Sequence, residues 1–141
     1  MTLRGATAIV GIADTEVGKL PHRTATDLCV EAALKAVEDA GLKLADVDGL
    51  VTCNSMAQPY MYHAEAVAEY LQIFPKYCVT ASAGGGATFT VLYQAALAIS
   101  AGICEVVVIS MADALRTGLS REQAMVMQSS SGHPKYETPY G

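Results

Sequence analysis

The sequence predicts an α/β fold with a mostly parallel β-sheet and a helix buried at its centre. Apolar runs typical of buried strands alternate with helix-like runs along the chain. The run 77–104 carries no charged residue and contains Gly84, Gly85 and Gly86 between a strand-like and a helix-like part. That helix-like part is apolar on nearly every side, so it has to be covered all round. We expect this cover to require more protein than the chain provides.

Composition limits the classes of function. The chain has 141 residues, of which 52% are hydrophobic and 16% charged, and its net charge is −5. The length suits one domain with a real core, and the apolar balance is typical of a chain with buried interfaces. Lysine and arginine are scattered without a basic stripe, which argues against nucleic acid as a partner. Glycines and hydroxyl residues interrupt the uncharged run, which argues against membrane insertion.

The cysteines indicate a reducing compartment. Cys29, Cys53, Cys78 and Cys104 show no C-x-x-C spacing, and most of them stand in apolar contexts. We interpret them as reduced, mostly buried thiols rather than disulfides or metal ligands. The sequence therefore predicts a cytoplasmic protein without a metal site. Its first residues lead into a strand-like run and not into the core of a signal peptide.

The first predicted elements are a strand and a helix. Residues 6–12 form a near-continuous apolar run, which predicts a strand buried on both faces of a sheet. Thr24 and Asp27 form a start like a capping box, and Gly41 supplies a stop, so we expect a helix over 24–40. Its predicted inner side holds Leu28, Ala32, Leu34, Ala36 and Val37.

The middle of the chain continues the alternation of strands and helices. In order, we expect a strand from residue 50, a helix over 62–71, a strand over 77–81, the uncharged helix ending at the glycine at 102, and a strand over 105–111. Strands that alternate with helices indicate βαβ units and a largely parallel sheet.

The pattern dissolves towards the end of the chain. Residues 114–127 are expected to be helical in part, and loop-forming residues follow them. Arg116 and Arg121 could contact a phosphate, although a charged helix face explains them more simply. We interpret residues 1–113 as an α/β unit and residues 114–141 as the start of a region whose fold is incomplete here.

The glycines at 84–86 are the first candidate site. They match neither phosphate-binding motif, because no Gly-Lys-Ser/Thr follows and Thr88 and Phe89 do not fit G-x-G-x-x-G. One interpretation is an oxyanion site, in which amides at the start of the uncharged helix face a thioester or phosphate oxygen. The other is a tight turn at which backbone and sheet approach closely. The sequence leaves both open.

Few other side chains are candidates for chemistry. Ser82 at the end of the strand 77–81 could be a nucleophile, but no histidine is near it in sequence, and a hydroxyl bonded to the backbone is the simpler interpretation. His133, between Gly132 and Pro134, could present a general base. A solvated surface side chain is the simpler interpretation for it, and His22 and His63 are judged in the same way.

Three stretches, taken together and in order, resemble the N-terminal part of the thiolase superfamily. They are AIVGIADT at 8–15, AGL followed by DVDGLV within 40–51, and GGGA, AALAI and VVVI within 84–109. The closest branch looks like the sterol-carrier-protein type, often labelled lipid-transfer proteins or acetyl-CoA acetyltransferases. The resemblance covers the whole chain but only about the first third of a family member, and the tail from His133 resembles the entry to the loop domain.

This resemblance implies a layered architecture. Family members stack two like halves as α-β-α-β-α, with the helix after the nucleophile in the middle layer. Residues 1–113 would belong to the N-terminal half, and residues 114–141 would begin the loop domain. Thiolases carry a nucleophilic cysteine at the start of that central helix, whereas the matching position here is Gly85 and the nearest cysteine is Cys78. The family's catalytic histidine and second cysteine belong to the C-terminal half.

The activity implied by the resemblance is a carbon–carbon bond reaction beside a CoA thioester. A glycine-rich turn without cysteine resembles the acyl-CoA lyases that act by a retro-aldol reaction with an OB-fold partner. We therefore expect an acyltransferase or lyase whose catalysis needs residues outside this chain. The alternative is a non-catalytic subunit that binds acyl-CoA or serves as a scaffold.

The candidate site and partners follow from that expectation. Ser82 and Gly85 are the candidate catalytic residues, and Gly84, Gly86 and Met111 join them as the lining of the acyl pocket. No bound cofactor is expected, because the CoA thioester is the substrate. In relatives the strand that matches Tyr77–Ala81 pairs across a two-fold axis, so the resemblance implies a homodimer.

Overall fold

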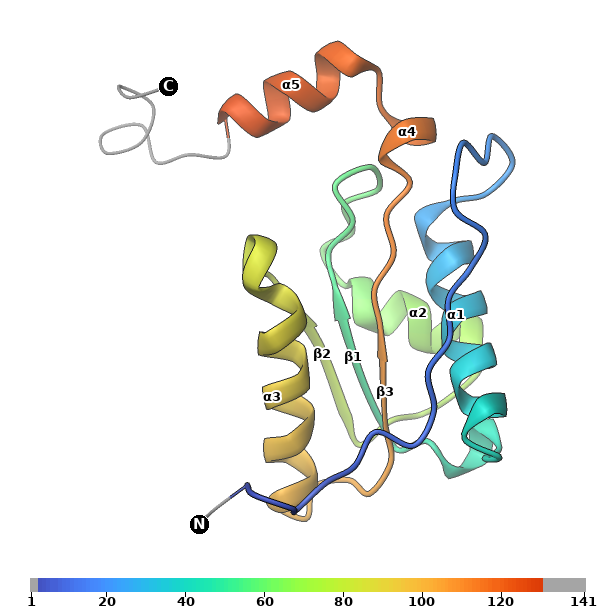
Figure 1. The fold of residues 1–141 in the computed structure, drawn as a ribbon, viewed down its shortest axis with the longest axis vertical. Coiled ribbons are helices and arrows are strands. Elements are labelled where there is room, and N and C mark those ends of the chain that lie inside the picture. The colour runs from blue at the N-terminus through green and yellow to red at the C-terminus, as the bar shows by residue number, and fades with distance from the viewer. Residues whose placement is uncertain (1–2, 131–141) are drawn as a thin grey trace.

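A sheet of three parallel strands forms the middle layer of the chain (Figure 1). The computed structural model describes residues 3–130. The strands are β1 (Gly49–Cys53), β2 (Tyr77–Ala81) and β3 (Val107–Ser110), in the order β2-β1-β3. Gly49 pairs with Tyr77 on one side and with Val107 on the other. The predicted α/β class with a parallel sheet is confirmed.

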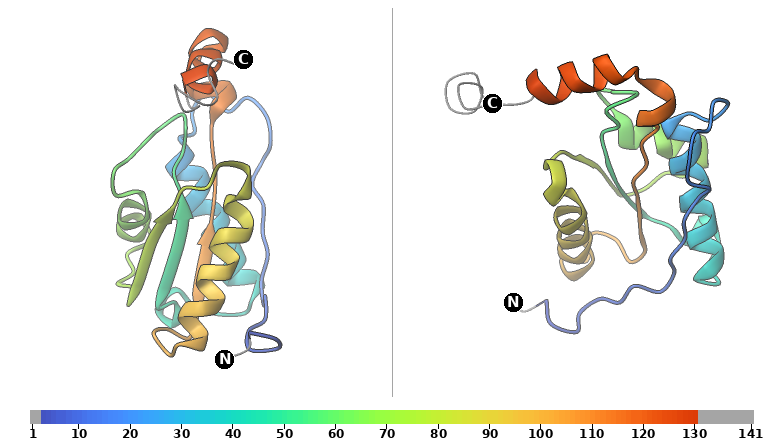
Figure 2. Two further views of the ribbon diagram at one scale, coloured as in Figure 1. Left: turned by 90° about the vertical axis from the view of Figure 1, so that its left-hand side faces the viewer. Right: turned by 45° about the horizontal axis from the view of Figure 1, so that its top comes forward.

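Helices cover both faces of this sheet, as the two views in Figure 2 show. α1 (Ala25–Asp39) and α2 (His63–Leu71) lie on one face, and α3 (Ala87–Ser100) lies on the other. The larger core cluster joins α1 and α2 to the sheet and includes Cys29, Val37, Leu50, Val67, Leu71 and Val108. A smaller cluster under α3 contains Val51, Ala81 and Val91. The layered α-β-α arrangement predicted from the sequence is therefore present.

α1 begins and ends as its sequence predicts. The Thr24 hydroxyl accepts a hydrogen bond from the Asp27 amide at 3.0 Å, and the Asp27 carboxylate accepts one from the Thr24 amide at 2.8 Å. Gly41 follows the helix with φ +68°, the left-handed conformation that ends helices. One predicted inward residue is wrong, because the side chain of Leu34 is 43% exposed.

α3 is covered on only one side by the described residues. Gly84–Gly86 form a 3-10 turn that runs directly into the helix. Val91 packs against the sheet, whereas Phe89 and Tyr93 are 78% and 59% exposed. The helix carries no charged residue on any side, but its outer face has no cover among residues 3–130.

The predicted strand at residues 6–12 is absent. This segment is extended but belongs to no sheet, and Ile9, Val10 and Ile12 are 65–75% exposed. It lies along α1, and a Cβ atom on Gly11 would be 2.3 Å from the carbonyl oxygen of Ala36. A strand needs a neighbour for its backbone groups, and no strand of the described chain stands beside this one.

Asp48 joins the starts of all three strands. Its Oδ1 atom accepts hydrogen bonds from the amides of Glu105 at 2.8 Å and Val106 at 2.9 Å, just before β3. Its Oδ2 atom accepts one from Lys76 Nζ at 3.0 Å, just before β2. Burial alone would raise the pKa of this carboxyl, but these hydrogen bonds prevail and lower it.

The region after β3 is helical in part, as predicted. It contains α4 (Leu115–Gly118) and α5 (Arg121–Ser130), and a short 3-10 turn (Leu44–Asp46) precedes β1. Residues 131–141, which include the candidate base His133 and most of the loop-like tail, lie outside the described residues.

Candidate functional site

The candidate residues gather at the carboxyl edge of the sheet. Because β1, β2 and β3 are parallel, they all end at this edge, at Cys53, Ala81 and Ser110. In open α/β sheets, ligands bind beside the carboxyl ends of the strands. The loop after β2 contains Ser82 and the glycines, and the segment after β3 begins with Met111.

The glycine turn is open to solvent. Ser82 and Gly84–Gly86 are all exposed, and the amides of Gly84 and Gly85 donate to no other described residue. A Cβ atom on any of the three glycines would meet nothing within 4 Å, so the turn does not pack closely against the sheet. Gly84 alone needs to be glycine for its backbone, since its φ is +51°. The open amides stand at the positive end of the α3 dipole.

Met111 lies apart from this turn. It lines a cavity of about 350 Å³ between the loop 14–20 and the segment 111–117. It also lines a second, larger cavity of about 650 Å³ along β3, and neither cavity includes Ser82 or the glycines. Within residues 3–130, the chain therefore does not bring the predicted pocket residues into one cavity.

Asp113 organises the loop that follows β1. Its Oδ1 atom accepts hydrogen bonds from the Ser55 hydroxyl at 2.9 Å and from the Ala57 amide at 3.2 Å. Its Oδ2 atom accepts one from the Met56 amide at 2.7 Å. This carboxylate, which follows β3, thus fixes the loop after the neighbouring strand. Asp113 is not among the residues predicted from the sequence, although a carboxylate just after a predicted strand is a usable signal.

His63 is buried, which corrects its interpretation as a solvated side chain. Its exposure is 0%, and neither ring nitrogen has a hydrogen-bond partner in the described residues. The ring stacks on Tyr60, with 6.2 Å between the ring centroids. Burial lowers the pKa of the imidazole, and the charge of Asp113 acts in the opposite direction. His63 is therefore a neutral group held beside the edge at which the strands end.

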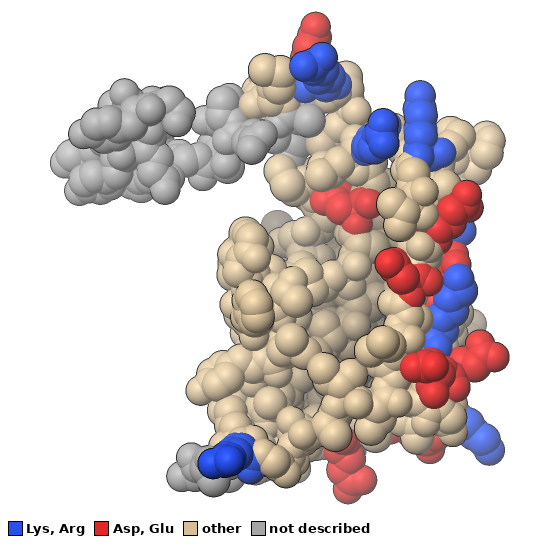
Figure 3. Space-filling view, in the orientation of Figure 1, with Lys and Arg blue, Asp and Glu red and all other residues tan. Residues whose placement is uncertain are grey.

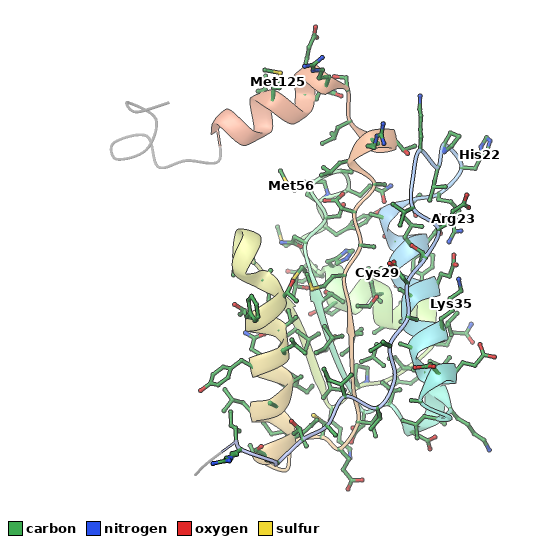
Figure 4. All side chains as sticks on the ribbon, in the orientation of Figure 1. His22, Arg23, Cys29, Lys35, Met56 and Met125 are labelled. Atoms are coloured by element: carbon green, nitrogen blue, oxygen red, sulfur yellow. The ribbon has the colours of Figure 1, made fainter. Side chains whose placement is uncertain are left out.

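The four thiols are poor nucleophiles at neutral pH. Cys29 lies between α1 and the sheet, whereas Arg23 and Lys35 lie on the outer side of the helix (Figure 4). Burial raises the pKa of the Cys29 thiol, and it raises those of Cys53, Cys78 and Cys104 as well. All four are free, and none stands at the start of α3.

No group of three or more His, Cys, Asp or Glu side chains within residues 3–130 is placed to hold a metal ion. None of the helices in this part of the chain combines the length and the apolar character needed to cross a membrane.

Comparison with known proteins finds relatives along most of the chain. A steroid side-chain-cleaving aldolase from Thermomonospora curvata is 40% identical over 119 residues, which are 83% of this chain and 29% of the relative. A 17-hydroxy-3-oxo-4-pregnene-20-carboxyl-CoA lyase from Mycobacterium tuberculosis is 37% identical over 83% of this chain and 30% of its own length. No known family profile matches the sequence.

Comparison of the structures gives the same kinds of relatives as comparison of the sequences. The solved structure of an Ltp2-ChsH2(DUF35) aldolase matches with a TM-score of 0.70 and 37% identity, over 90% of this chain and 33% of the solved chain. Acetyl-CoA acetyltransferases are also among the relatives, at lower identity. The chain spans about three tenths of the length of the curated relatives it matches. Its motif order, its layered parallel sheet and these relatives together identify it as a member of the thiolase superfamily.

Proposed function

We propose that the chain is part of a thiolase-like enzyme that cleaves a carbon–carbon bond next to a CoA thioester by a retro-aldol reaction. The observation that carries this proposal is the start of α3, where open glycine amides stand in place of a cysteine. The names of two relatives, a side-chain-cleaving aldolase and a carboxyl-CoA lyase, support the same class of reaction.

The proposed chemistry needs an oxyanion site rather than a nucleophile. A base removes the proton from the hydroxyl on the carbon β to the thioester, and that oxygen becomes a carbonyl as the bond between the α and β carbons breaks. The released electron pair forms an enolate on the thioester oxygen, and protonation at the α carbon gives the shortened acyl-CoA. Amides of Gly84 and Gly85 would stabilise that oxygen, which their lack of a partner among residues 3–130 and their position at a helix N-terminus support.

The roles of the other residues follow from their positions. Ser82, which is exposed next to the glycines, would orient the thioester, and Gly86 would leave room for the acyl chain. Met111 would contact the substrate only at the far side of the edge, because its cavities do not include the turn. The acid and base groups would come from polypeptide outside this chain.

We also propose the partners that this activity implies. β2 is an edge strand, so it would pair with the same strand of a second copy across a two-fold axis. An OB-fold subunit, which the family resemblance implies, would complete the acyl site, and the two-part name of the Ltp2-ChsH2(DUF35) aldolase fits a complex with a partner subunit for that protein. The competing proposal is an acyl-CoA-binding subunit without turnover.

The experiment compares binding of a β-hydroxyacyl-CoA by calorimetry. Gly85→Val places a branched side chain over the amides, so we expect affinity to fall at least about tenfold. Ala101→Val, at the exposed far end of the same helix, is the matched control and should bind like the wild type. Unchanged affinity in Gly85→Val would reject the oxyanion site. Binding without turnover by the longer polypeptide that supplies the acid and base groups, assembled with an OB-fold subunit, would favour the scaffold.

A further inference from the structure

The loop that follows β1 is held in place by side chains. Residues 55–60 take part in no backbone–backbone hydrogen bond of the described chain. Instead, the Ser55 hydroxyl and the amides of Met56 and Ala57 all donate to the carboxylate of Asp113. Met56 marks this loop in Figure 4, at the end of the sheet where the strands finish. One carboxylate, which comes from the segment after β3, is therefore the main polar anchor of the loop.

The same loop leads directly into His63, the first residue of α2. Tyr60 stacks on the imidazole with an angle of 8° between the ring planes. His63 is 0% exposed, and neither ring nitrogen has a hydrogen-bond partner in the part of the chain that is described. Such an imidazole has given up its hydrogen bonds to water and has gained none in return, which is a net cost. The closed loop therefore keeps a polar ring in an unfavourable place.

Asp113 is the charged group that acts on this imidazole. α2 packs against α1, β1 and β2, and the titratable side chains that α1 and β2 turn towards the shared core are the thiols of Cys29 and Cys78. Both thiols stay neutral because burial raises their pKa, and Cys53 on β1 packs on the side of α3. The carboxylates of α2 itself are exposed, at Glu65 and Glu69.

Protonation of His63 would change what Asp113 binds. An imidazolium has two N–H donors and a charge, and it is costly to bury without an acceptor. The Asp113 carboxylate raises the pKa of His63, although burial lowers that pKa by more. Hydrogen bonds between charged groups are roughly twice as strong as those between neutral groups, so the cation competes with Ser55, Met56 and Ala57 for the carboxylate oxygens. Asp113 is itself exposed, so an imidazolium that reaches it also regains water.

We propose that His63 and Asp113 form a pH-sensitive latch for the loop 55–60. While His63 is neutral, Asp113 holds the loop closed over the imidazole. When His63 takes a proton from solvent, the imidazolium pairs with Asp113, the loop loses its anchor and it opens at the carboxyl edge of the sheet. The Gln58 side chain, whose Oε1 atom accepts a hydrogen bond from the Ala25 amide at 2.8 Å, keeps the open loop tethered to α1. The latch does not depend on the proposed reaction, because it uses neither the glycine turn nor a thioester.

The test measures hydrogen exchange of the full chain by NMR between pH 7.5 and pH 5.5. Protection factors remove the intrinsic effect of pH on exchange, so they report opening alone. Protection of the Met56 and Ala57 amides should fall by about five- to tenfold over this range, because an imidazole in the open loop takes up its proton near its ordinary pKa of about 6.5. Unchanged protection of these amides would contradict the latch.

Low concentrations of urea separate opening of the loop from unfolding of the whole chain. Opening of the loop exposes little surface, so the exchange of the Met56 and Ala57 amides should hardly respond to urea. Exchange of amides inside α1 by global unfolding should accelerate steeply with urea. The same protection and the same urea response in the loop and in α1 would overturn the proposal, because the loop would then open only when the chain unfolds.

Three variants test the two members of the latch. His63→Phe keeps a ring for Tyr60 to stack on and removes the titrating group, so the protection of the loop should no longer depend on pH. His63→Gln gives the same readout if the larger ring does not fit. His22→Gln, at an exposed position, is the matched control and should keep the wild-type dependence. Wild-type dependence in both His63 variants would exclude His63 as the sensor.

Asp113→Asn tests the anchor. The amide that replaces the carboxylate leaves one acceptor oxygen and brings a donor towards the loop amides, so their protection should already be at least about fivefold lower at pH 7.5. It should fall little further at pH 5.5, because the imidazolium no longer has a carboxylate to compete for. Wild-type protection at pH 7.5, or the full wild-type fall at pH 5.5, would overturn the role of Asp113.

Discussion

Single residues at the carboxyl edge of the sheet differ in whether their importance can be predicted from the sequence. The glycines at 84–86 stand out because a triplet between a strand and a helix is a local pattern. His63 and Asp113 do not stand out, because what distinguishes them is burial and a set of partners far away in the chain. Local patterns could therefore locate the edge, but not the polar groups that the fold brings to it.

The thiols provide a prediction at the scale of single residues. Burial raises the pKa of all four, and none begins α3, so none should become an acyl-enzyme nucleophile. After incubation with acyl-CoA, peptide mass mapping should find no acyl adduct on any cysteine. A stable thioester on Cys78, the cysteine nearest to the glycine turn in sequence, would contradict the retro-aldol proposal.

His63 should make stability depend on pH. Its pKa is lowered in the folded state, so below the unfolded value of about 6.5 the unfolded chain takes up a proton that the folded chain does not. We expect the free energy of unfolding to fall between pH 7.5 and pH 5.5, and His63→Gln to reduce that fall. Urea unfolding at several pH values measures it, with His22→Gln at an exposed position as the control. The same slope in both variants would mean that His63 is not the group responsible.

Whole elements could be predicted where one segment carries its own signal. The caps of α1, the extent of β2 and the order of strands and helices from α1 onwards are predicted correctly, because capping boxes, glycine stops and apolar runs act within a few residues. The prediction of a strand at residues 6–12 is wrong for the opposite reason. Their pattern describes a strand with neighbours on both sides, and no local signal says whether those neighbours belong to the same chain.

Asp48 gives the prediction that belongs to the sheet as an element. Asp48→Ala leaves the amides of Glu105 and Val106 without their acceptor, so stability should fall by about 2–4 kcal/mol. Asp48→Asn keeps an acceptor oxygen and should cost less, because the pair with the mostly exposed Lys76 adds little. Urea titration compares the two, and equal losses would contradict the role of the amides.

The pKa of Asp48 adds a dependence on acid. Because it is lowered in the folded state, its contribution is complete above the unfolded value of about 3.9 and is lost as the pH falls through the lower, folded value. The free energy of unfolding should therefore fall less between pH 5 and pH 2 for Asp48→Asn than for the wild type. Identical acid titrations of the two proteins would show that another carboxyl dominates.

At the scale of the whole molecule, two surfaces have no cover from the described residues: the outer face of α3 and the free edge of β2. The sequence already indicated both, since an uncharged helix and a short uncharged strand have to be buried somewhere. What it could not indicate is which protein covers them, because that depends on shape beyond this chain.

The dimer is the prediction at this scale. Sedimentation velocity of the wild type at micromolar concentration should give a dimer, and Val79→Lys, in the middle of β2, should give a monomer or an aggregate. Tyr70→Lys on α2, at a side chain that is 65% exposed, adds the same charge away from the edge and should remain dimeric. A monodisperse wild-type monomer would exclude pairing through β2.

The uneven distribution of charge has a physical consequence for the isolated chain. Charged side chains gather along α1 and around α4 and α5, while the surface over α3 is nearly free of them (Figure 3). The face in this view is therefore amphiphilic, with a charged side along α1 and an apolar side over α3. The chain has a net charge of −5, and charge repulsion between copies acts mainly at the charged surface along α1. Sulfate strengthens apolar contacts, so it should make copies associate through the apolar surface over α3. At an air–water interface the chain would align like a surfactant, with α3 turned away from the water.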